Sequence, residues 1–187
     1  MGPEQLMQAA QAGEPAAAEE LVECFYGRIY ALHRRLTGNP ADAADLTQRT
    51  FSRAWQALPG FAGRCSVGSW LHKIAYNLYL DWRRADQHRQ TRHSEWWLAQ
   101  VDPPAPDEQL ITRDLAARLY LAVDKLEPVL RETLHLLYYQ ELSLEEVAAA
   151  MSVAASTVKY RRKMALKELQ KEMAEPVAGL ARTARAL

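Results

Sequence analysis

Apolar residues recur at helical spacing in the first part of the chain, and Gly38-Asn39-Pro40 interrupts the pattern. A glycine, a capping residue and a proline at the first helical position are typical of the junction between two helices. The pattern therefore predicts a helix over residues 16–37, with an inward stripe of Leu21, Val22, Phe25, Ile29, Leu32 and Leu36.

A second helix is expected from just after Pro40 to Pro59-Gly60. Its predicted inward side carries Leu46, Thr50, Phe51, Ala54, Trp55 and Leu58. The opposite side is polar and comprises Asp42, Asp45, Gln48, Arg49 and Ser52. A helix with two such faces packs on one side and offers the other to solvent or to a partner.

A third helix is predicted from about Val67, capped by Ser66, to Arg84, after a loop that contains Gly60 and Gly63. Its inward stripe is Trp70, Leu71, Ile74, Ala75, Leu78 and Trp82. The remaining positions form a basic and aromatic surface, which we expect to be exposed: His72, Lys73, Tyr76, Asn77, Tyr79, Arg83 and Arg84.

Periodicity fades after residue 85, and Pro103, Pro104 and Pro106 forbid a continuous helix there. Residues 86–109 are therefore predicted to be a flexible linker, in which Trp96 and Trp97 fit a short helix packed on a neighbour. Helical patterns resume over residues 110–126 and 128–139 and in a final helix pair. The predicted fold is all-α: two small helical domains, 1–85 and 110–173, joined by the linker and followed by a tail, 174–187.

The final pair has the spacing of a helix-turn-helix. Ser143 and Glu146 form a capping-box pattern, Ala148 allows a close helix crossing, and Ser152 and Val153 fall in the turn. Ser156 or Thr157 is expected to cap the second helix, whose inward positions are Val158, Ala165 and Leu169. The residues expected to face a DNA major groove are Ser156, Thr157, Lys159, Tyr160, Arg161 and Lys163. An ordinary helical hairpin with a solvated basic face is the alternative.

The charges of the chain balance, with 23 basic and 23 acidic residues, which argues against a protein that coats nucleic acid non-specifically. A local patch is nevertheless strongly basic, because residues 159–171 carry six positive side chains and one acid. No apolar run approaches the ~20 residues that cross a bilayer, and the N-terminus lacks a secretory pattern. We therefore expect a cytoplasmic protein that does not bind membranes.

Candidate chemistry is sparse. No set of nucleophile, base and electrophile is recognisable, and the glycine-containing loop lacks the preceding strand and lysine of a phosphate-binding loop, so an enzyme is not expected. Cys24 and Cys65 lack partners at metal-ligand spacing, so no metal or cofactor is expected. We interpret both as small apolar fillers, with a redox role for Cys65 beside Arg64 as the alternative.

Several stretches together resemble one family. They are Gly38 to Trp55, then Phe61, Gly63 and Ser66, then Trp70 to Asn77 with Asp81, and in the second domain Leu126, Arg131, Leu134, Leu136, Tyr138, Leu142-Ser143, Glu146-Val147-Ala148 and Thr157-Val158-Lys159. In this order and spacing the chain resembles bacterial sigma factors of the extracytoplasmic-function (ECF) group.

The resemblance implies a division of labour. The second helix would bind the clamp helices of the largest subunit of RNA polymerase, through Asp42, Asp45, Leu46, Gln48, Thr50 and Phe51. The loop and third helix would melt and read the promoter −10 element, through Phe61, Arg64, Lys73, Tyr76, Asn77, Arg83 and Arg84. The helix-turn-helix would read the −35 element beside the flap of the second-largest subunit, and the linker would thread toward the polymerase active site. An anti-sigma factor is the expected regulator.

Four residues depart from the family pattern. Arg49 and Ala44 stand where acids are usual, Met164 replaces an arginine that often meets DNA, and Arg162 replaces a packed apolar residue. The promoter sequence therefore cannot be inferred from relatives. The competing hypothesis is a stand-alone regulator that uses only its helix-turn-helix and binds a palindrome as a dimer.

Overall fold

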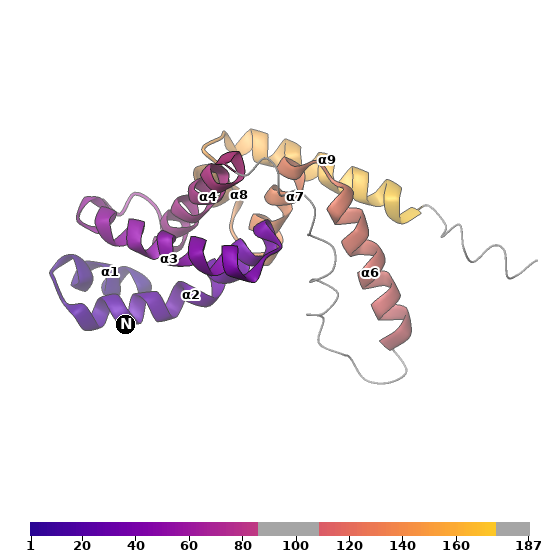
Figure 1. Ribbon diagram of the computed structural model, residues 1–187. Helices are drawn as coiled ribbons and strands as arrows, with labels where there is room; N and C mark the ends of the chain where they lie inside the picture. Colours follow the sequence, from indigo (N-terminus) through magenta and orange to yellow (C-terminus); the bar gives the residue numbers. More distant parts are fainter. Residues whose placement is uncertain (86–108, 175–187) are drawn as a thin grey trace, which may run out of the picture.

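The computed structural model describes residues 1–85 and 109–174 (Figure 1). Within these ranges the chain is helical and contains no strand, as predicted. The first half comprises α1 (Pro3–Gln11), α2 (Pro15–Thr37), α3 (Pro40–Ala57), the 3-10 turn η1 (Leu58–Gly60) and α4 (Val67–Ala85). The predicted linker with Trp96 and Trp97, and the tail, lie outside the described residues.

The second half comprises α6 (Gln109–Lys125), α7 (Pro128–Leu134), the π-helical turn η2 (His135–Tyr139), α8 (Leu144–Met151) and α9 (Ala155–Ala174). In Figure 1, α6 projects away from the first half, whereas α8 lies against α4. The predicted helices are confirmed to within a few residues. The sequence did not predict α1, which buries Leu6 and Met7 against α2.

Local sequence explains the break between α2 and α3. Gly38 ends α2 in the left-handed conformation, with φ of 67°, which glycine adopts without steric cost. Asn39 then caps α3, because its side-chain oxygen accepts hydrogen bonds from the backbone amides of Ala41 and Asp42, at 2.8 and 3.4 Å. Pro40 occupies the first helical position, where no amide donor is needed.

Two hydrophobic clusters organise the core. The smaller belongs to the second half alone and joins Leu126, Leu130 and Leu134 to Ala165 and Leu169. The larger crosses between the halves: it contains the inward stripes of α2 and α4 together with Leu136, Leu142, Val147, Ala148, Met151 and Val158. The helix-turn-helix therefore packs directly on the first half.

That packing corrects one prediction about the third helix. Its basic and aromatic surface was expected to be exposed, yet His72, Tyr76 and Tyr79 are all at least 95% buried, because α7 and α8 cover that side of α4. A single-helix pattern cannot predict this burial, since the covering residues lie more than fifty positions away along the chain.

Three smaller predictions were also wrong. Trp55 is half exposed and not part of the inward side of α3. Cys24 and Cys65 are exposed free thiols and not fillers of the core. Ser156 and Thr157 do not cap the last helix, because α9 already begins at Ala155 and both residues lie in its first turn.

No helix in the described ranges is both long enough and apolar enough to span a bilayer. The same ranges contain no group of three histidine, cysteine or acidic side chains placed to hold a metal ion.

Candidate functional site

The helix-turn-helix forms as its sequence predicts. Ser143 Oγ accepts a hydrogen bond from the Glu146 amide at 3.2 Å, and the Ser143 amide donates to Glu146 Oε2 at 2.9 Å, which completes the capping box. Ser152 ends α8 with φ of 55° and turns the chain toward α9. Val147 and Val158 are fully buried between the two helices, which fixes how α9 is presented.

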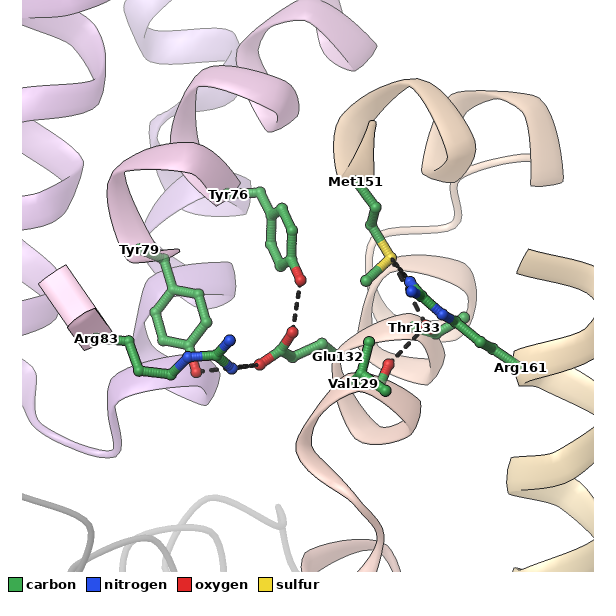
Figure 2. Close-up of polar contacts among 8 residues, drawn as sticks. All are labelled: Tyr76, Tyr79, Arg83, Val129, Glu132, Thr133, Met151 and Arg161. Carbon is green, nitrogen blue, oxygen red and sulfur yellow. Dashed lines mark hydrogen bonds and ion pairs between the residues drawn. The ribbon is translucent and has the colours of Figure 1, made fainter. Parts of the chain in front are cut away.

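The first turns of α9 present an exposed basic surface. Lys159 and Lys163 are exposed, and Tyr160 is 62% exposed. Arg161 differs, because it is only partly exposed and its Nη1 lies 3.8 Å from Met151 Sδ in α8, as Figure 2 shows. Arg161 is thus partly covered by α8, whereas Lys159 is exposed.

The loop that precedes α4 is held from the N-terminal side. Gln11 Nε2 donates hydrogen bonds to the carbonyl oxygens of Leu58 and Phe61, both at 2.9 Å. The ring of Phe61 packs on Trp70, with centroids 5.0 Å apart. Ser66 caps α4, because its Oγ accepts the Ser69 amide at 3.1 Å. These contacts fix the two ends of the loop.

Of the residues predicted to contact the −10 element, Arg64, Lys73, Asn77 and Arg84 have exposed side chains, and Phe61 and Arg83 are partly exposed. Tyr76 is buried, with only 3% of its surface accessible. The predicted surface thus has two parts. We call the exposed residues Arg64, Lys73, Asn77 and Arg84 the accessible rim, and the buried residues Tyr76 and Tyr79 the buried centre.

The buried centre is organised by Glu132, an acid of α7 that the sequence did not single out (Figure 2). Tyr76 donates to its Oε2 at 2.5 Å, Tyr79 donates to its Oε1 at 3.3 Å, and the Arg83 guanidinium pairs with Oε1. Glu132 is only 2% exposed. Burial, and then the charge and hydrogen bond of Glu132, raise the pKa of Tyr76, so its hydroxyl stays protonated and remains a donor.

Two further polar contacts join α4 to the second half. Ser66 Oγ and Ser69 Oγ donate to Glu146 Oε1 at 2.9 and 2.7 Å. These hydrogen bonds, with that from the Ser143 amide, lower the pKa of Glu146 to about 2. His72 Nε2 lies 3.1 Å from Gln140 Oε1. Nothing in the sequence pattern marks Glu132 or Gln140, because the partners of each come from the other half.

The outer side of α3 carries the predicted polymerase-binding residues. Asp45 and Gln48 are exposed, and Asp42 is partly exposed. Arg49, which stands where an acid was expected, lies 3.5 Å from Asp45 and partly offsets its charge. A shallow groove beside them is lined by Val22, Tyr26, Ala44, Asp45, Gln48 and Phe51.

Two predicted polymerase contacts lie beneath this surface. Leu46 and Thr50 are fully buried. Thr50 donates to the carbonyl oxygen of Leu46 at 2.7 Å and lies 3.0 Å from His33 Nε2. They support α3 from inside, so any direct contact must come from the exposed neighbours.

Comparisons with known proteins show which family the chain belongs to. Residues 21–89 match the family model of Sigma-70 region 2, and residues 116–169 match that of Sigma-70 region 4. The chain is 30% identical to the ECF RNA polymerase sigma factor SigK of Mycolicibacterium vanbaalenii over 81% of each protein. The chain belongs to the ECF sigma factor family. The resemblance seen in the sequence is thereby confirmed.

Other ECF sigma factors are similar to this chain over most of its length. It is 32% identical to the ECF sigma factor SigE of Mycolicibacterium smegmatis over 89% of this chain, and it spans 65% of that relative's length. It is 27% identical to SigW of Bacillus subtilis over 86% of this chain and 91% of that protein.

Two solved structures resemble this sigma factor in fold. One is CnrH in complex with the cytosolic domain of CnrY, with a TM-score of 0.67, 24% identity, and 90% of this chain and 94% of that chain covered. The other is RpoE of Bartonella quintana in complex with the anti-sigma factor NepR, with a TM-score of 0.61, 21% identity, and coverage of 83% and 95%. At such low identity these likenesses show a shared fold alone.

Proposed function

We propose that this sigma factor binds core RNA polymerase and directs initiation at promoters that its two halves recognise together. The observation that carries the proposal is the presence of both a region 2 match and a region 4 match in one chain of the ECF family. On this proposal it acts by binding and not by catalysis, and it works in the cytoplasm together with the polymerase.

The proposed division follows the two matches. Residues 1–85 bind polymerase and melt and read the −10 element, and residues 110–173 read the −35 element. Residues 86–109 form the linker between them, and residues 174–187 form a tail without an assigned role. The accessible polar side of α3 supports the assignment of residues 1–85, and the exposed basic turns of α9 support that of residues 110–173.

The polymerase contact is proposed to involve the clamp helices of the largest subunit. Asp45 and Gln48 offer charge and hydrogen-bonding groups, and Phe51 provides apolar surface in the groove beside them. The second half is proposed to meet the flap of the second-largest subunit. Leu115, Leu119 and Leu121 of α6 are exposed and suit such an apolar contact.

For promoter contacts, we propose that Arg64, Lys73, Asn77 and Arg84 act at the −10 element from the accessible rim of α4 and its loop. Lysine and arginine can hold backbone phosphate, and the Asn77 amide offers both a donor and an acceptor to a base. At the −35 element we propose Lys159, Tyr160 and Lys163, with Ser156 and Thr157 in the first turn of α9.

An anti-sigma factor is the proposed regulator. The neighbour RpoE was solved in complex with the anti-sigma factor NepR, and CnrH was solved in complex with the cytosolic domain of CnrY. In this chain a hollow lined by Pro15, Ala18, Glu19, Val22, Glu23 and Trp55 offers apolar surface to such a partner. The half-exposed Trp55 makes this hollow a reasonable contact point.

The deciding experiment is transcription in vitro with purified core polymerase on a library of promoter fragments. We expect initiation at a defined start site only when the protein is added. A protein that binds a palindromic duplex tightly on its own, as a dimer, and gives no initiation with core enzyme would instead be a stand-alone regulator. Replacing Asp45 and Gln48 by alanine should weaken the complex with core enzyme, whereas Glu4→Ala, an exposed change in α1, should leave it unchanged.

A further inference from the structure

Three donors of α4 converge on one acid of the other half. Tyr76, Tyr79 and Arg83 supply two hydroxyl protons and a guanidinium, and all three reach the carboxylate of Glu132. A carboxylate loses favourable hydration when it is buried, so it is retained only where charge and hydrogen bonds replace that hydration. The three α4 side chains thus form a site that selects an anion with two acceptor oxygens.

This arrangement cannot persist on a promoter, if the proposed function holds. The −10 and −35 elements lie about 25 base pairs apart, which is ~85 Å at ~3.4 Å per base pair. In the structure the two halves touch, since Ser69 Oγ of α4 lies 2.7 Å from Glu146 Oε1 of α8. Both elements can be held only after α4 separates from α7 and α8.

Separation leaves Tyr76, Tyr79 and Arg83 without their anion. A DNA phosphate matches what Glu132 supplied, because it carries negative charge and offers acceptor oxygens. The accessible rim around this site already carries Lys73, Asn77 and Arg84. We propose that Tyr76, Tyr79 and Arg83 form a phosphate-binding site for single-stranded promoter DNA, which Glu132 occupies while the sigma factor is closed.

In the closed form, in which α4 packs against α7 and α8, contacts other than those of Glu132 also hold the two halves together. Ser66 and Ser69 bind Glu146, His72 lies beside Gln140, and one hydrophobic cluster includes Leu71 and Leu136 from opposite halves. Because Glu132 belongs to the same chain, it competes with DNA at a high effective concentration. DNA affinity is then reduced by the small fraction of open molecules, and a partner that binds the two halves apart raises it.

The test uses the full chain and Glu132→Gln, which keeps the volume of the side chain and removes its charge. Small-angle scattering should show a larger radius of gyration. Anisotropy of a short fluorescein-labelled DNA single strand of mixed sequence should show affinity raised about 5-fold, as the open fraction grows. Glu172→Gln is the matched control, because Glu172 pairs with Lys125 inside the second half, at 2.6 Å. It should change neither measurement.

A double variant identifies the site. With Arg83→Gln in the background, Glu132→Gln should still open the chain but should no longer raise DNA affinity. An unchanged radius and affinity in Glu132→Gln would show that Glu132 does not close the protein. If Glu132→Gln raises DNA affinity equally in the presence and absence of Arg83, this α4 site does not bind phosphate. Either result overturns the proposal.

A second variant covers the case in which Glu132→Gln does not fold, as judged by circular dichroism. Ser66→Ala with Ser69→Ala removes the hydrogen bonds to Glu146 and leaves Glu132 in place. This variant should also have a larger radius of gyration and a higher affinity for DNA, and the rise in affinity should again require Arg83. If neither the radius nor the affinity rises, the proposal is contradicted. Scattering and mixed-sequence DNA require no polymerase. If these two measurements contradict the phosphate site but the protein still directs promoter-dependent initiation, only the phosphate site is excluded and the proposed function is retained.

Discussion

The hydroxyl of Tyr76 donates a 2.5 Å hydrogen bond to Glu132 Oε2 and so joins two halves of the chain across 56 residues of sequence. Hydrogen bonds to charged acceptors are among the stronger ones in proteins. This contact makes Tyr76 part of the interface between the halves, although its position in the sequence predicts an exposed surface.

Tyr76→Phe should lower the free energy of unfolding by about 1.5–3 kcal/mol, because it removes a hydrogen bond to a buried carboxylate. Urea unfolding followed by circular dichroism measures the change. Tyr138→Phe is the control, since Tyr138 lies in the second half with 55% of its surface exposed. Equal unfolding midpoints for both variants would mean that the Tyr76 bond contributes no stability.

His33 should make the fold sensitive to acid. Burial, followed by the charge of His72, lowers the pKa of His33 to about 3, whereas its ordinary value is 6.5. Above pH 6.5 the imidazole is neutral in both states and the fold keeps its full stability. As the pH falls from 6.5 toward 3, only the unfolded chain takes up the proton, so stability is lost.

The contribution of His33 is measurable by difference. Between about pH 7.5 and about pH 4.5, the native protein should lose about 2 kcal/mol more stability than His33→Gln, in urea unfolding at each pH. The comparison cancels the other titrating groups. Parallel losses in the two proteins would show that His33 titrates normally in the fold.

The two basic residues at the start of α9 differ in accessibility, yet both are expected to contribute to DNA recognition. Lys159 is exposed, whereas Arg161 Nη1 lies against Met151. If they reach base edges, Lys159→Ala and Arg161→Ala should each weaken recognition of the upstream element by about 1–3 kcal/mol, measured as holoenzyme binding to matched and altered promoters. Equal loss on every sequence would mark phosphate contacts. Lys171→Ala, near the far end of α9, is the control.

Asn77 should act during promoter opening. Its side chain is exposed on α4, beside the buried contact with the second half. Asn77→Ala should reduce formation of the open complex, because one base loses its hydrogen-bonding partner. Permanganate footprinting measures the melted region. Reactivity equal to that of the native protein would contradict this role, and Glu4→Ala, an exposed change in α1, serves as the control.

The sequence alone determined the local structure. Gly38, Asn39 and Pro40 set the junction between α2 and α3, and Ser143 with Glu146 set the start of the helix-turn-helix. These features depend on residues within one helical turn of each other, so caps and periodicity suffice to predict them. The family resemblance likewise rested on local motifs whose order and spacing are visible in the chain.

Only the tertiary structure decided which side of α4 is available. Helical periodicity placed Tyr76 and Tyr79 outside the inward stripe of α4, yet both are buried in the structure. The second half supplies another core surface, led by Leu136 and Val147, and a buried acid, Glu132. The free energy of that packing depends on contacts between residues far apart in sequence, and no pattern within a single helix encodes it.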